Sequence, residues 1–192
     1  MTRSLPGGVR RGAKPGTLPR LVHGAEVWQN ARLVIMTRLH DLEGLSTCLA
    51  DSALITQLHD MRIAARRLRY SLELFMDAVP PVHTEVATTA LNICREMQDL
   101  LGAIHDADVL MPQLVEQMHR ELKPGLPNEK NVAPFGVHFI NWDSCTGLIS
   151  TCRDVMQERD HAFDKINEAW RVQKEAGIFV ALAAAAGVGA DA

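Results

Sequence analysis

The sequence is poor in aromatic residues and has no long apolar run. Aromatic residues make up 5% of its 192 residues, and the 47% hydrophobic content is mostly Ala, Leu, Val, Ile and Met, which favours packed helices over sheets. No stretch reaches the roughly 18 apolar residues of a membrane-spanning helix, and the N-terminus lacks the apolar segment of a secretion signal. We therefore expect a cytoplasmic, all-α protein with one sizeable core.

Paired cysteines and an excess of positive charge are also missing. The formal net charge is −3, which argues against a general nucleic-acid binder, so any site for a polyanion must be local. The cysteines form no CxxC pair, and we expect buried, reduced thiols and not a disulfide framework or a zinc site. Cysteine occurs four times, at Cys48, Cys94, Cys145 and Cys152.

Motifs for nucleotide hydrolysis and nucleophilic catalysis are absent as well. The chain has no GxxxxGK[ST] phosphate loop, no GxGxxG fingerprint, and no Ser/His/Asp or Cys/His arrangement at informative spacing. We expect no catalytic residues, no resident metal and no cofactor. The expected activity is binding without turnover.

The stretch that stands out is His59–Phe75, HDMRIAARRLRYSLELF. At roughly 100° per residue, four of its basic side chains fall within about an 80° arc of one helix, beside the apolar arc that would face a core. We call these four residues the basic stripe. They are His59, Arg62, Arg66 and Arg69.

Permanent charges repeated along one helix edge repel one another and mildly destabilise the helix. Either acidic residues on neighbouring helices pair with the arginines, giving an ordinary salt-bridged or solvated surface, or the edge faces an anion. Forked guanidinium donors in a line suit phosphate oxygens best. The histidine at the head of the stripe would add a donor, and raise the affinity for an anion, below neutral pH.

Two motifs give the chain a family resemblance. The spacing HxxRxxxRRLRxxxxxF in His59–Phe75, followed by LGxxHDxDVL in Leu101–Leu110, resembles the CHAD (conserved histidine α-helical domain) family. The resemblance implies a helical domain that binds inorganic polyphosphate, often at polyphosphate granules. It also implies binding residues: His59, Arg62, Arg66, Arg67 and Arg69 match the first basic cluster, and His105 stands where the family commonly has arginine.

Apolar periodicity predicts a bundle of antiparallel helices with a smaller second helical lobe. Asp51 and Ser52 are expected to cap the second helix, Gly102 to stop the third, and His105 and Asp106 to cap the fourth. Asp106 could also hold an arginine of the basic stripe. The predicted parts are a flexible basic arm (1–24), a CHAD-like domain (25–186) made of a four-helix lobe (25–122), a linker (123–142) and a smaller lobe (143–186), and a tail (187–192).

Other functions remain open. The dipeptides His40–Asp41, His59–Asp60 and His105–Asp106 also suit a metal-dependent HD-type phosphohydrolase, and the helix faces could serve a protein–protein adaptor. The second half contains no copy of the HxxRxxxRRLR run. CHAD proteins typically have two similar halves that line one basic channel, so a homo-oligomer could complete the channel here. We expect neither a membrane partner nor sequence-specific nucleic-acid binding.

Overall fold

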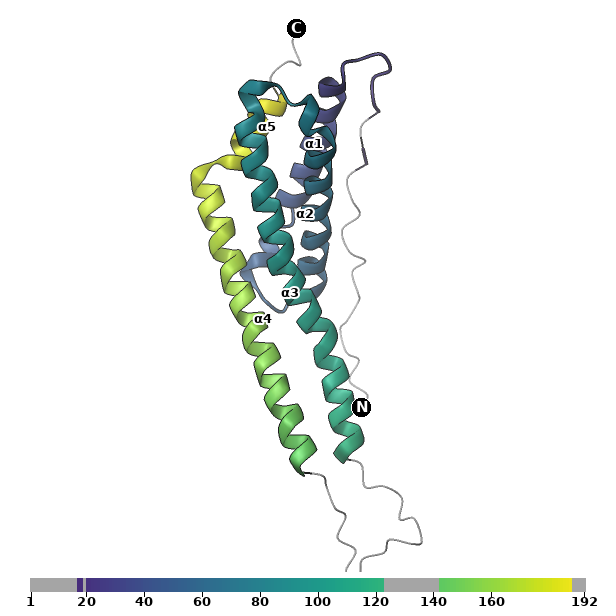
Figure 1. The fold of residues 1–192 in the computed structure, drawn as a ribbon, viewed down its shortest axis with the longest axis vertical. Coiled ribbons are helices and arrows are strands. Elements are labelled where there is room, and N and C mark those ends of the chain that lie inside the picture. Colours follow the sequence, from purple (N-terminus) through teal and green to yellow (C-terminus); the bar gives the residue numbers. More distant parts are fainter. Residues whose placement is uncertain (1–16, 19, 123–141, 188–192) are drawn as a thin grey trace, which may run out of the picture.

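The computed structural model describes residues 17–18, 20–122 and 142–187 of the chain. These residues form five α-helices and three short 3₁₀ helices, with no strand among them (Figure 1), which confirms the predicted all-α bundle. Most of the predicted arm, the predicted linker before Trp142, and residues 188–192 of the predicted tail lie outside the described residues. The elements are α1 (Val27–Glu43), η1 (Ser46–Ala50), α2 (Ile55–Phe75), η2 (Met76–Ala78), η3 (Pro81–His83), α3 (Thr84–Leu122), α4 (Trp142–Ala176) and α5 (Ile178–Gly187).

Helix α1 packs against α2, which in turn packs against α3. The apolar periodicity explains this, because residues three and four positions apart lie on the same helix face. On α1 the apolar residues at this spacing are buried, except for Val27, which is 62% exposed at the first turn. The buried residues of α1 are Ala31, Val34, Ile35, Leu39 and Leu42.

The start of α2 differs from the prediction. Its N-cap residue is Leu54, and no side chain caps the helix. Asp51 Oδ1 instead accepts a hydrogen bond from the Ala53 backbone N–H at 2.9 Å, forming a tight turn that precedes the helix. Because Asp51 and Ser52 lie in this turn, before the helix begins, the predicted cap at these residues is wrong.

Helix α3 is one continuous helix of 39 residues, so the predicted break at Gly102 is wrong. Buried side chains continue on both sides of the glycine, at Leu101 and Ile104. A glycine inside a helix costs about 1 kcal/mol relative to alanine, which is less than the gain from burying either neighbour. His105 and Asp106 therefore lie within a helix and cap nothing, and residues 25–122 contain three α-helices in place of the predicted four.

Helices α4 and α5 pack directly onto the first three helices. Their buried residues Ile166, Phe179 and Leu182 belong to the same hydrophobic core as those of α1, α2 and α3. Gly177 separates the two helices and has a φ of 66°, a left-handed conformation that favours glycine. The lobe boundaries in the sequence stay predictions.

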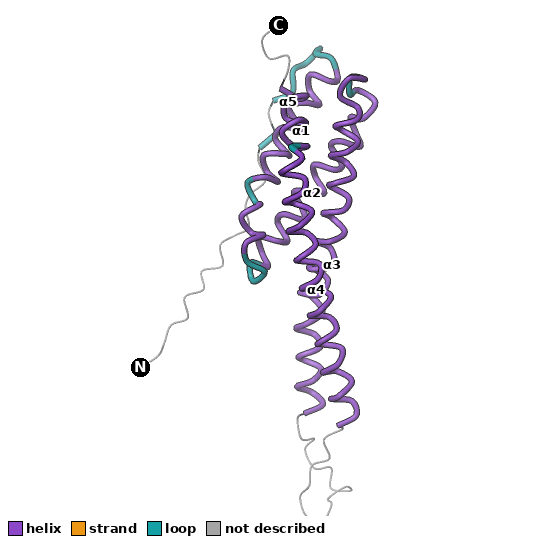
Figure 2. Tube along the Cα trace, turned by 90° about the vertical axis from the view of Figure 1, so that its left-hand side faces the viewer, coloured by secondary structure: helices purple, strands orange, loops and turns teal. Residues whose placement is uncertain are grey.

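Helices α3 and α4 extend side by side beyond the ends of α1 and α2 in both views of the molecule (Figures 1 and 2). The basic stripe lies on α2, within the thicker part of the bundle, where α1 and α3 flank it. Within the described ranges, no helix combines the length and the apolar character needed to cross a membrane.

Candidate functional site

All four residues of the basic stripe lie on the single unbroken helix α2 and are half-buried. The buried side chains of α2, among them Leu58, Ala65 and Leu72, occupy the adjacent face of the helix. The stripe therefore has the geometry that the spacing predicts, with its cationic side chains along one edge of a core-facing helix.

Helix α3 brings His105 against the start of the stripe. The His59 Nδ1 and His105 Nδ1 atoms are 3.3 Å apart, and the two ring centroids are separated by 4.7 Å with the rings tilted by 40°. The two residues are 46 positions apart and come from the two separate motifs. At this distance only one of the two Nδ1 atoms can carry the shared proton, because the other must accept.

Gly102 lies on the same face of α3 as His105, one turn before it. It is close to Arg62 of α2. A Cβ atom at Gly102 would stand 3.8 Å from Arg62 Nε. The Nε atoms of Arg62 and Arg69 are both buried without a hydrogen-bond partner among the described residues. Buried N–H groups without partners are rare in native proteins and point to a missing water or ion.

Carboxylates do not neutralise most of the stripe. Within the described part of the chain, Arg62 and Arg66 have no side-chain hydrogen bond or ion pair. Arg69 has a distant ion pair, with 3.9 Å between its Nε and Glu73 Oε1, and its guanidinium carbon lies 4.7 Å from the centre of the Tyr70 ring. Of the two explanations for the stripe, the anion-facing edge fits Arg62 and Arg66 better than internal salt bridges.

Arg95 on α3 is a cation that the sequence reasoning missed. Its Nη2 donates to Glu73 Oε1 at 3.0 Å, so one carboxylate connects Arg95 to the end of the stripe near Arg69. Gln98, whose Oε1 is buried without a partner, lies between Arg95 and Gly102 on this face of α3. Arg95, Gln98, Gly102 and His105 are separated by three, four and three residues, which is the spacing of one helix face. A prediction of one unbroken third helix would have placed Arg95 on the same face as His105.

Arg69 also lies close enough to α3 for its charge to lower the pKa of Cys94. Burial raises the pKa of the Cys94 thiol to about 12, and the positive charge of Arg69 offsets part of that rise. Arg67, in contrast, lies about 80° around α2 from His59, on the side away from Arg62 and Arg69. Its predicted role in phosphate binding stays a prediction.

The second motif supplies a structural ion pair. Arg159 on α4 donates from Nε to Asp108 Oδ1 at 2.6 Å and from Nη2 to the Ser52 carbonyl at 2.7 Å. Arg159 is 7% exposed, so this ion pair is buried. Asp106, predicted to hold an arginine of the stripe, is exposed and forms no ion pair within the described ranges. Arg159 instead joins Asp108 of α3 to the turn before α2.

The HD dipeptides form no metal-binding cluster in the part of the chain that the structure describes. There, no three His, Cys, Asp or Glu side chains come together as a metal-binding group would require. His40 is exposed in the last turn of α1, whereas His59 and His105 face each other.

Comparison with known proteins gives one match. Residues 21–115 match the sequence model of the CHAD domain, a segment that runs from before α1 to Val115 in α3 and includes the whole basic stripe, Arg95 and His105. The curated proteins and the solved structures gave no match to the chain. The first three α-helices, which carry the basic stripe and its partner His105, therefore belong to the CHAD domain family.

Proposed function

We propose that the basic stripe binds inorganic polyphosphate. The observation that carries this proposal is the pair of half-buried arginines, Arg62 and Arg66, which lack a carboxylate partner in the described part of the chain and stand beside the His59–His105 contact. Membership of the CHAD family supports the same ligand.

The geometry of the stripe suits a linear polyanion. From His59 to Arg69 the helix rises about 15 Å, at about 1.5 Å per residue. Successive guanidinium groups along this rise would each contact a phosphate group, and a planar guanidinium can donate two parallel hydrogen bonds to one phosphate. Arg95 would extend the cationic surface from α2 to α3.

The overall charge fits a local site. With a net charge of −3, the protein repels polyanions at a distance, and the attraction is concentrated where cations gather without acids. Binding would therefore depend steeply on salt, because each phosphate contact releases counterions. In a cell that contains polyphosphate granules, we propose that the protein is recruited to them.

The direct test compares wild type with the triple variant Arg62→Ala/Arg66→Ala/Arg69→Ala in binding to long-chain polyphosphate. The matched control is Arg120→Ala/Arg153→Ala/Arg171→Ala, which removes the same charge from exposed arginines outside the stripe. Helical circular dichroism verifies that each variant is folded. We expect the stripe variant to lose at least about tenfold in affinity and the control to lose much less.

Two results would contradict the proposal. Equal losses in the two triple variants would mean that net charge alone sets the affinity. Release of phosphate from polyphosphate by the wild-type protein, dependent on a divalent metal, would instead support the HD-type phosphohydrolase.

A further inference from the structure

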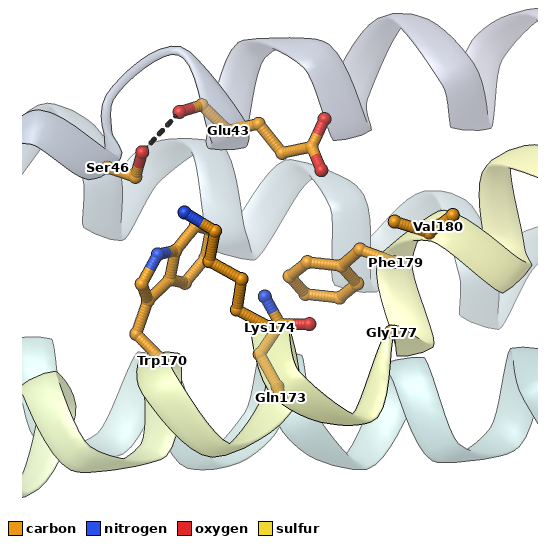
Figure 3. A pocket seen from close by; sticks show the side chains of 8 residues that line it. All are labelled: Glu43, Ser46, Trp170, Gln173, Lys174, Gly177, Phe179 and Val180. Carbon is orange, nitrogen blue, oxygen red and sulfur yellow. Dashed lines mark hydrogen bonds between the residues drawn. The ribbon is translucent and has the colours of Figure 1, made fainter.

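A cavity lies outside the stripe, between the end of α1, η1, the last turns of α4 and the start of α5 (Figure 3). Its volume is about 260 Å³. Trp170, Gln173 and Lys174 project into it from α4, and Glu43 faces them from the end of α1. No residue of the basic stripe lines this cavity, so it is separate from the proposed polyphosphate site.

The cavity is built around a buried amide. Gln173 is 6% exposed, and its Oε1 has no hydrogen-bond partner among the described residues. A buried amide without a partner is costly in a core, and such groups call for a ligand, an ion or water. Rotation about the last side-chain bond lets either the oxygen or the NH₂ group of Gln173 face the cavity.

Opposite charges line the two sides of this cavity. The carboxylate of Glu43 and the ammonium of Lys174 form no ion pair with each other or with any other described residue. Only the backbone carbonyl of Glu43 is engaged, as the acceptor for Ser46 Oγ at 2.7 Å. Both side chains are exposed at the rim of the cavity, where they are complementary to a ligand that carries both charges.

Aromatic rings supply the apolar part of the wall. The centroids of the Trp170 and Phe179 rings are 5.8 Å apart. The volume corresponds to about nine waters at roughly 30 Å³ each, below the roughly 300–1,000 Å³ of pockets for drug-sized ligands. The occupant must therefore be small.

We propose that this cavity binds a small zwitterion with an apolar group, which is the chemistry of a free apolar amino acid. Lys174 contacts the ligand carboxylate, Glu43 contacts its ammonium group, and the rings of Trp170 and Phe179 contact its apolar side chain. The amide of Gln173 completes the hydrogen bonding at whichever end it faces.

Calorimetric titration of the full chain tests this with three probes: L-leucine, 3-methylbutylamine, which lacks the carboxylate, and 4-methylpentanoate, which lacks the ammonium group. We expect L-leucine to bind at least about tenfold more tightly than either of the other two. Absence of L-leucine binding at millimolar concentration, or equal affinity for one of the singly charged probes, would overturn the proposal.

Variants assign the two ends of the ligand. Lys174→Met should weaken binding of L-leucine and 4-methylpentanoate and leave 3-methylbutylamine unchanged, and Glu43→Gln should do the opposite. Lys165→Met is the matched control, because Lys165 is an exposed lysine of α4 outside this cavity. If Lys174→Met binds L-leucine as tightly as Lys165→Met does, the assignment is wrong.

Discussion

The contact between His59 and His105 places two imidazole rings together at the start of the basic stripe. With 3.3 Å between the two Nδ1 atoms, one ring donates and the other accepts. If both rings are charged, two N–H groups point at each other, and an anion that accepts from both relieves the repulsion. Polyphosphate would then bind better as the pH falls.

Replacing His105 by arginine tests this. The His105→Arg variant carries a permanent charge beside His59, so we expect tighter polyphosphate binding at about pH 8 and a smaller change in affinity between about pH 8 and about pH 6. Affinity measured at both pH values checks the prediction. An unchanged pH dependence in His105→Arg would show that this contact does not control binding.

The buried cysteines give a prediction about reactivity. Burial raises the pKa of Cys94 to about 12 and that of Cys48 to about 11, so at about pH 8 both thiols stay protonated and unreactive. We expect iodoacetamide to modify the partly exposed Cys152 first, as measured by peptide mass spectrometry. The raised pKa values also mean that the protonated thiols stabilise the fold. Thiols of the unfolded chain ionise at about pH 8.5, so this stabilisation is fully present below that pH. It is lost as the pH rises toward about 11 for Cys48 and about 12 for Cys94. Modification of Cys94 as fast as Cys152 would contradict the prediction.

At the scale of elements, the continuity of α3 sets the shape of the candidate site. The sequence predicts every α-helix, because apolar residues recur at helical spacing, and it predicts the stripe, because the stripe depends on the geometry of one helix. It does not predict that the helix continues through Gly102. That outcome depends on packing against α2, which outweighs the local preference of glycine. Arg95 was missed for the same reason.

The Gly102→Ala variant tests whether α3 is continuous at this point. The new Cβ atom would lie 3.8 Å from Arg62 Nε, an ordinary van der Waals distance, and alanine favours the helix. We expect the free energy of unfolding, measured with urea, to rise by about 0.4–1 kcal/mol, with polyphosphate binding retained. A clear loss of stability would contradict an unbroken helix with room for a methyl group.

At the scale of the whole molecule, Arg159 connects the two halves of the chain. Its contacts with Asp108 and with the Ser52 carbonyl fix α3 and the start of α2 relative to α4. These partners are 51 and 107 positions away in the sequence, so helical spacing gives no sign of the pairing. The cavity at Gln173 was missed for a similar reason, because it forms only when α1, α4 and α5 meet.

Removing Arg159 leaves the Asp108 carboxylate buried without a partner. We expect Arg159→Ala to lower the free energy of unfolding by about 3–5 kcal/mol in urea denaturation, and Arg159→Ala/Asp108→Ala to recover part of this loss. The control Arg171→Ala removes an arginine from an exposed ion-pair network and should change stability little. A loss in Arg159→Ala no larger than in Arg171→Ala would contradict a buried structural ion pair.

The salt dependence of polyphosphate binding tests the central claim most directly. For a flexible single-stranded polyanion, the logarithm of the affinity falls with the logarithm of salt concentration by about 0.7 for each phosphate contact. Arg62→Ala/Arg66→Ala/Arg69→Ala should therefore bind with a slope that is shallower by about 2, and the control triple variant should keep the wild-type slope. If the stripe variant keeps the wild-type slope, the basic stripe is not the polyphosphate site.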